Sequence, residues 1–248
     1  MPRKPRQFEI GNVYHIINRG VDGRKIFLKD QDYSRFILSL EFFNTSDSAD
    51  IWSLITRDGG GFNPPPAEGR IRERLENQRK NMSESIVELL AFALMPNHYH
   101  LIIREIIDKG ISLFMQKIGG YTNYFNKQYN RKGSLFESSY RYIKAEDDTK
   151  LFVDFNYVHT NPVELIEPLW KDQQVKDFDK TKEFLENYQW SSYRDYIGLP
   201  TFPNVINKKF FLEFFNNEEN CKKTVEDWIK FKADNYKQKE LFNPRDYE

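Results

Sequence analysis

The hydrophobic pattern of the chain predicts short strands separated by amphipathic helices. Runs rich in β-branched residues, or with alternating apolar and polar positions, are typical of strands. Apolar residues spaced three and four apart, after an acidic residue that can cap the first turn, are typical of helices. The predicted strands are 12–18, 86–95, 98–105 and 140–144, and the predicted helices are 30–43, 111–129 and 147–160.

These elements follow one another as β-α-β-β-α-β, with a further helix behind them. That order is typical of the ferredoxin-like (RRM-like) α+β fold, in which two helices cover one face of an antiparallel sheet. A charged segment rich in Gly and Pro, 57–85, breaks the pattern, and we interpret it as an insertion. We expect residues 1–200 to form the main domain and residues 201–248 a helical C-terminal extension.

Two histidines stand out in the strand at 98–105. His98 and His100 follow a Pro-Asn turn, and residues two apart in a strand point to the same face. Neutral imidazole is the commonest metal ligand, so the pair could form half of a divalent-metal site. A hydrogen-bonded pair of histidines at a sheet edge would give the same pattern, and the spacing alone does not separate the two interpretations.

A second candidate segment lies at the end of the helix 147–160. Tyr157 and Asn161 are four residues apart, so a helix places them on one face. A tyrosine hydroxyl can act as a covalent nucleophile, and an amide oxygen is a suitable ligand for magnesium or manganese. The alternatives are that Tyr157 is a core aromatic and that Asn161 simply ends the helix before Pro162.

Composition narrows the class of protein but does not identify it. Cys221 is the single cysteine, so no internal disulfide can form, and no apolar run is long enough to cross a membrane. The basic start of the chain also lacks the apolar segment of a secretory signal, so we expect a cytoplasmic protein. The net charge of zero averages unlike parts, because segments 1–35 and 116–144 are basic and segment 163–248 is acidic.

Five motifs taken together resemble a known family. In this order they resemble the single-tyrosine transposases of the histidine-hydrophobic-histidine (HUH) class, and in particular the branch of REP-associated tyrosine transposases. The resemblance runs from about residue 8 to about residue 198. The motifs are Tyr14–Gly20, Met95–His100, Gly133–Phe136, Tyr157–Pro162 and Trp190–Tyr193.

The resemblance implies a metal-dependent DNA strand transferase. It implies that His98, His100 and Asn161 bind Mg²⁺ or Mn²⁺, and that Tyr157 attacks single-stranded or hairpin DNA to leave a 5′-phosphotyrosine link. It also implies either a monomer or a homodimer. Two alternatives remain open: a protein that binds hairpin DNA without cleaving it, and a metal phosphodiesterase that uses water as the nucleophile.

DNA contacts are expected from basic residues outside this set. The candidates are Arg19 in the first motif, the basic aromatic stretch with Lys127, Arg131 and Lys132, and Arg141, which could replace an arginine that the family usually has before Tyr140. The alternative for the basic stretch is a solvated helix face.

Three other side chains have no clear place in this scheme. Tyr99, where the family usually has an aliphatic residue, should face away from the metal. We expect His15 to lie near the site without being a ligand, and His159 to pack or to contact DNA.

Overall fold

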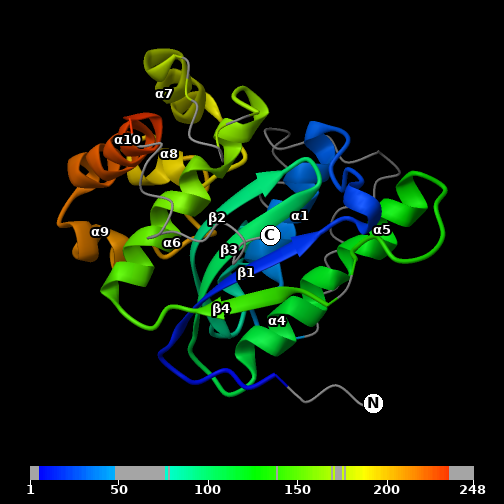
Figure 1. Ribbon diagram of the computed structural model, residues 1–248. Coiled ribbons are helices and arrows are strands. Elements are labelled where there is room, and N and C mark those ends of the chain that lie inside the picture. Colours follow the sequence, from blue (N-terminus) through cyan, green and yellow to red (C-terminus); the bar gives the residue numbers. More distant parts are fainter. Residues whose placement is uncertain are drawn as a thin grey trace.

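A four-stranded antiparallel sheet organises the molecule (Figure 1). The computed structural model describes residues 6–47, 76–77, 79–137, 139–168, 170, 175 and 177–234. The strand order is β2-β3-β1-β4, which is the order of a ferredoxin-like sheet, so the predicted fold class is confirmed. The strands are β1 (Val13–Arg19), β2 (Val87–Met95), β3 (His98–Glu105) and β4 (Arg141–Lys144).

Three helices cover one face of the sheet. The side chain of Tyr99 on β3 points toward them, and its ring centroid lies 4.8 Å from that of Phe36 on α1. The hydroxyl of Tyr121 on α5 donates a 2.7 Å hydrogen bond to the carbonyl of Ile26, so this layer is tied together by polar as well as apolar contacts. The helices are α1 (Asp30–Phe42), α4 (Gly110–Gly119) and α5 (Tyr121–Gln128), and a short 3₁₀ turn, η1 (Val21–Gly23), precedes α1.

Helix α6 (Asp148–Thr160) packs against β2 and β3, and in Figure 1 it lies on the other side of the sheet from α4 and α5. The carboxylate of Asp147 caps it by accepting a 2.7 Å hydrogen bond from the backbone amide of Lys150. The helix ends before Pro162, as predicted, and continues as a 3₁₀ turn, η2 (Asn161–Leu165). The end of α6 at this point sets where Asn161 lies relative to the sheet.

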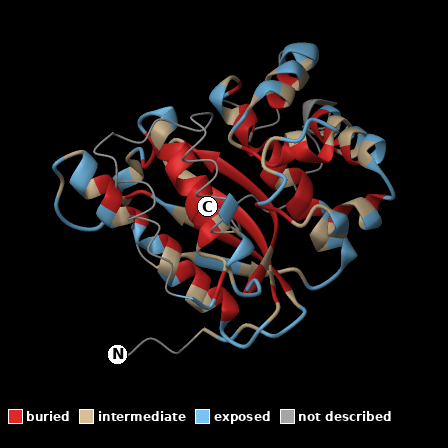
Figure 2. Cartoon of the chain, turned by 180° about the vertical axis from the view of Figure 1, so that it is seen from behind, coloured by how far each residue is buried: buried red, intermediate tan, exposed pale blue. Residues whose placement is uncertain are grey.

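The C-terminal part of the chain packs on the outer side of α6. Phe155 of α6 is fully buried, and its ring centroid lies 4.7 Å from those of both Phe211 and Phe215. Figure 2 shows buried residues through the sheet and through the helices around it. These outer helices are α7 (Phe178–Asn187), α8 (Tyr193–Tyr196), α9 (Lys209–Phe215) and α10 (Glu218–Asp234).

Two local features differ from the sequence-based prediction. The single helix predicted over 111–129 is two helices. The chain bends at Gly119 and Gly120, because glycine has a low helix propensity and two of them in a row weaken a continuous helix. The segment at Trp190 was not predicted to pair with the sheet, yet the amide of Leu94 donates to its carbonyl and the amide of Ser192 donates to the carbonyl of Phe92. The proposed insertion 57–85 lies largely outside the described residues.

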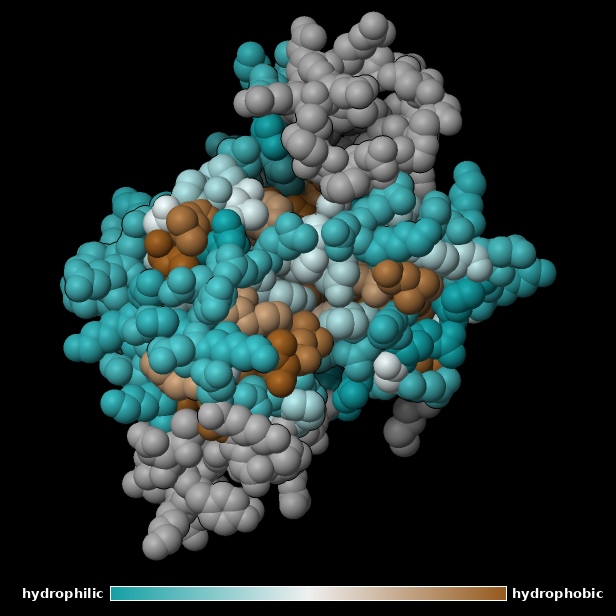
Figure 3. All heavy atoms as spheres, turned by 90° about the horizontal axis from the view of Figure 1, so that it is seen from above, coloured by the Kyte–Doolittle hydropathy of each residue, from teal (hydrophilic) through white to brown (hydrophobic). Residues whose placement is uncertain are grey.

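The described surface is mainly polar. Figure 3 shows a largely hydrophilic face with small, separate hydrophobic patches. None of the described helices has both the length and the apolar character needed to cross a membrane. The large apolar side chains that are most exposed among the described residues are Ile10, Leu28, Ile107, Tyr142, Phe152, Leu165 and Leu199.

Candidate active site

Strand β3 presents two imidazoles to the side of the sheet that faces α6. The ring centroids of His98 and His100 lie 4.9 Å apart, and His100 is almost fully buried whereas His98 is partly exposed. Tyr99 points to the opposite face, as predicted, and its burial raises the pKa of its hydroxyl. The strand therefore separates the two histidines from the intervening tyrosine, which is unsuited to act as a rival nucleophile.

Helix α6 brings Tyr157 and Asn161 over the same histidines. Oδ1 of Asn161 lies 3.1 Å from Nε2 of His98. The ring centroid of Tyr157 lies 5.5 Å from that of His100, with the two planes nearly perpendicular. The fold thus brings together residues that are far apart in the chain. Tyr157 follows His100 by 157 − 100 = 57 positions.

The donor set fits a divalent cation. Nδ1 of His98 lies 2.7 Å from Oδ1 of Asn97, and if it donates there, Nε2 directs a lone pair toward Oδ1 of Asn161. The 3.1 Å between Nε2 of His98 and Oδ1 of Asn161, a hydrogen bond when Nε2 carries the proton, is also close to the separation of two ligands at right angles around Mg²⁺, which is about 3.0 Å. The third donor is an amide, and no cluster of three or more His, Cys, Asp and Glu side chains suited to a metal occurs among the described residues.

A buried polar chain lies behind His100, and it begins with His15, which was expected near the site without being a ligand. His15 on β1 is fully buried, and its Nε2 lies 2.9 Å from Nδ1 of His100. Its Nδ1 lies 3.3 Å from Oδ1 of Asp154, which in turn lies 3.2 Å from Nζ of Lys150. Asp154 precedes Tyr157 by three residues on α6, so helical spacing was the available signal for this residue.

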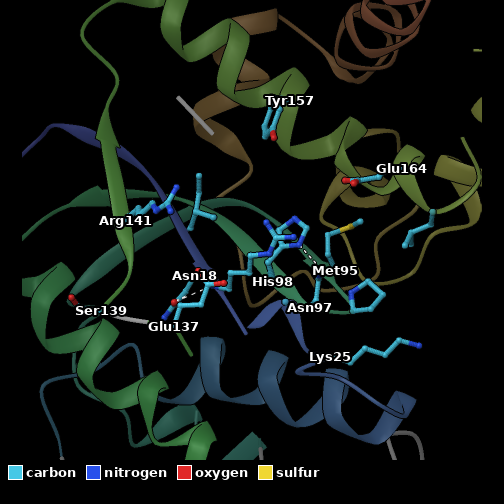
Figure 4. Close-up of a pocket in the computed structure, with 15 residues that line it drawn as sticks. Asn18, Lys25, Met95, Asn97, His98, Glu137, Ser139, Arg141, Tyr157 and Glu164 are labelled. Atoms are coloured by element: carbon cyan, nitrogen blue, oxygen red, sulfur yellow. Dashed lines mark hydrogen bonds between the residues drawn. The ribbon is translucent and has the colours of Figure 1, made fainter. Parts of the chain in front are cut away.

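A cavity of about 350 Å³ opens in front of Tyr157 and His98 (Figure 4). In Figure 4 the hydroxyl end of Tyr157 points into the space above His98, with Arg141 at one side. Two residues expected to contact DNA, Arg19 and Arg141, line this cavity, and Lys25 adds a third cation. These three cations share the cavity with the carboxylates of Glu137 and Glu164. Further lining residues, which the sequence did not single out, are Asn18, Glu137, Ser139 and Glu164.

The other basic candidates lie away from this cavity. Lys127 belongs to α5, on the far side of the sheet from α6, and Arg131 and Lys132 follow that helix. The guanidinium of Arg131 donates to Oδ1 of Asn126 at 2.8 Å and to the carbonyl of Ser134 at 3.0 Å. Arg131 thus orders the turn between α5 and β4, while Lys127 and Lys132 are exposed.

His159 is a packing residue. Its ring is fully buried between Phe155 and Tyr196, and Nε2 lies 2.8 Å from Oγ of Ser192. Desolvation lowers the pKa of His159 to about 3, so the ring is neutral at ordinary pH. Of the two roles considered for it, packing is the one that its position supports, because no part of the imidazole reaches the surface.

The comparison with known protein families agrees with the resemblance that the sequence motifs carry. Residues 66–161 match the model of a family described as "Transposase IS200 like", and this segment contains His98, His100, Tyr157 and Asn161. The resemblance to single-tyrosine transposases is confirmed by this match. No curated protein matches the sequence.

One solved structure aligns with most of the chain. It is described as the REP-associated tyrosine transposase bound to a REP hairpin. The alignment covers 83% of this chain and 90% of that chain, with 14% sequence identity and a TM-score of 0.46.

Proposed function

We propose that this protein is a metal-dependent transposase that cleaves and rejoins single-stranded DNA beside a hairpin through a 5′-phosphotyrosine intermediate. The observation that supports it best is the meeting of Tyr157 and Asn161 with His98 and His100. These are the residues for which the resemblance implies a nucleophile and three metal ligands, and the segment matching the transposase family contains all of them.

The chemical step is a transesterification. Oη of Tyr157 gives up its proton and forms a bond to phosphorus while the bond between phosphorus and the 3′ oxygen breaks, and the departing 3′ oxygen takes up a proton, so the step has no net proton change. The downstream strand stays attached to Tyr157 through its 5′ phosphate. Attack by another 3′ hydroxyl reverses these changes and joins two strands. The energy of the phosphodiester is kept in the phosphotyrosine link, so no nucleotide cofactor is required.

The chain's own residues position the substrate for this step. His98, His100 and Asn161 would hold Mg²⁺ or Mn²⁺, which when bound would stabilise negative charge on the scissile phosphate. Arg19 and Arg141 line the cavity in front of Tyr157 and would bind neighbouring phosphates. Lys127, Arg131 and Lys132 would bind a more distant part of the same DNA.

The proposal includes a site that is complete within one copy of the chain. Tyr157 faces histidines of its own sheet, and the outer side of α6 is covered by Phe211 and Phe215 of the same chain. We therefore propose that a monomer carries out cleavage, and that a homodimer would contain two separate sites.

A denaturing gel tests this proposal directly. The substrate is a pool of DNA hairpins with randomised single-stranded flanks, labelled at the 3′ end in one set and at the 5′ end in another, with Mn²⁺ present. Only the 3′ label should migrate with the protein, because a 5′-phosphotyrosine keeps the downstream fragment.

Substitutions identify the nucleophile. Tyr157→Phe should lower adduct formation by at least about 10³-fold while DNA binding persists, because only one oxygen is lost. Tyr140→Phe is the matched control and should form the adduct normally, since Tyr140 is covered by the guanidinium of Arg6, 4.0 Å from its ring. Cleavage without an adduct would instead indicate water as nucleophile, and binding without cleavage would indicate a DNA-binding protein.

A further inference from the structure

The buried chain behind His100 has a defined direction of hydrogen bonding. Asp154 is 1% exposed, and its Oδ1 forms an ion pair with Nζ of Lys150 at 3.2 Å. Nδ1 of His15 lies 3.3 Å from Oδ1 of Asp154, and because a carboxylate accepts, this ion-pair contact favours the tautomer of His15 that carries the proton on Nδ1. A neutral imidazole has a single N–H, which leaves Nε2 of His15 as an acceptor.

The same argument applies to the ring of His100. Because Nε2 of His15 accepts, Nδ1 of His100, 2.9 Å away, must be the donor. Nε2 of His100 then holds a lone pair and is the nitrogen that can coordinate a cation. Metal-binding histidines commonly donate their other N–H to a carboxylate or another acceptor, which fixes tautomer and ring orientation.

We propose that His15 and Asp154 are positioning residues that fix His100 in the tautomer able to bind the metal. They act through His100, and Asp154 comes from the helix that carries Tyr157, so the nucleophile and the ligand share one buried support. This inference rests on the proposed role of His100 as a ligand. It extends the site to a strand and a helix turn that the four expected residues do not include.

Nuclear magnetic resonance of the metal-free protein gives the first test. With ¹⁵N-labelled histidine, long-range ¹H–¹⁵N correlation spectra report which ring nitrogen of each histidine carries the proton, and the chain has only four histidines to assign. His100 should be protonated at Nδ1 in the wild type. His15→Phe should release this preference, because phenylalanine cannot accept the hydrogen bond. His15→Gln should restore it, since the amide oxygen reaches about as far as Nε2.

Mn²⁺ affinity, measured by titration calorimetry without DNA, gives the second test. His15→Phe should weaken binding by about 10- to 100-fold, the usual cost of losing a residue that supports a metal ligand. His15→Gln should recover most of that loss. The matched control is His159→Phe, which replaces the other fully buried imidazole and should leave Mn²⁺ affinity unchanged, because His159 contacts Ser192 and aromatic rings away from the ligands.

The outcomes separate this inference from the proposed function. A wild-type His100 protonated at Nε2, or a His15→Phe variant that binds Mn²⁺ as tightly as the wild type, would overturn the positioning role. If both tests succeed but no covalent DNA adduct forms, the positioning role stands and the transposase proposal fails. If the adduct forms and His15→Phe has no effect on Mn²⁺ affinity or on the tautomer, the transposase proposal stands and the positioning role fails.

Discussion

Helix α6 presents two faces, and each face meets a different part of the molecule. The face toward the sheet carries Asp154 and Tyr157, with polar groups of β1 and β3 around them. The outer face carries Phe155 and His159, which pack among aromatic side chains of α8 and α9. Adjacent positions of one helix thus belong to the proposed site on one side and to an aromatic core on the other, and substitutions on the two faces should produce different defects.

The largest effect on stability is expected on the outer face. Phe155→Ala removes a fully buried ring from a cluster that includes Tyr196, Phe211 and Phe215, and should lower the free energy of unfolding by about 3–5 kcal/mol. Urea unfolding measures the loss. At low temperature, where the variant stays folded, adduct formation per folded molecule should fall far less than in Tyr157→Phe. An adduct yield as low as that of Tyr157→Phe would show that the faces are not separable.

Substitution of the proposed metal ligands should lower cleavage and leave stability largely unchanged. His98→Ala and His100→Ala should each lower cleavage by at least about 100-fold, because removing a ligand costs more than removing a residue that supports one. Excess chelator should stop cleavage by the wild type, and Asn161→Ala should raise the Mn²⁺ concentration needed. His159→Ala, the same change on the outer face, should reduce stability and leave the Mn²⁺ requirement unaltered. Cleavage that persists in chelator would remove the metal from the mechanism.

Acidic pH should lower the free energy of unfolding through His159 on the outer face of α6. Its folded-state pKa of about 3 lies below the ordinary value near 6.5, so below pH 6.5 the unfolded chain binds a proton that the folded chain does not. The contribution is therefore complete above pH 6.5 and is lost as the pH falls toward 3. Between pH 7 and pH 5 it amounts to about 2 kcal/mol. Urea unfolding of His159→Phe at both pH values should lack this part of the wild-type decrease, and equal decreases would contradict the burial argument.

The smallest expected effect concerns a third region, the basic turn after α5. Replacing Lys127, Arg131 and Lys132 together by Ala should lower DNA affinity and reduce the salt dependence by up to about three phosphate contacts. Replacing Arg19 and Arg141 should lower the affinity for a single-stranded flank specifically, because both line the cavity beside Tyr157. Wild-type protein should prefer a flanked hairpin to a duplex of the same sequence. Equal affinity for the two, or an unchanged salt slope, would relocate the DNA surface.

The sequence predicted the sheet side of α6 well because its pattern is local. Period-two alternation placed His98 and His100 on one face, and the four-residue spacing placed Tyr157 over Asn161. The same periodicities set the boundaries of β1, β3 and α6 to within one or two residues.

What the sequence did not reveal depends on contacts between distant segments. The contact of His15 with Asp154 joins residues 154 − 15 = 139 positions apart, and the helical spacing that relates Asp154 to Tyr157 does not point to His15. The break between α4 and α5 depends on a glycine pair that a helix can also tolerate. Helices α7 and α8 were not predicted, because they are short and are placed by contacts with distant segments: α7 contacts η2 and α10, and α8 contacts α10 and, through Tyr196, α6.

Ser192 has a consequence for any attempt to define a minimal catalytic fragment. Its amide donates to the carbonyl of Phe92 at the edge of β2, and its hydroxyl lies 2.8 Å from the buried ring of His159 on α6. A chain cut at Asn161, where the family match ends, would lose this clasp and expose the β2 edge, and an uncovered strand edge favours aggregation. The shortest fragment that keeps this contact must therefore extend beyond Ser192, well past Asn161, the last residue of the proposed site.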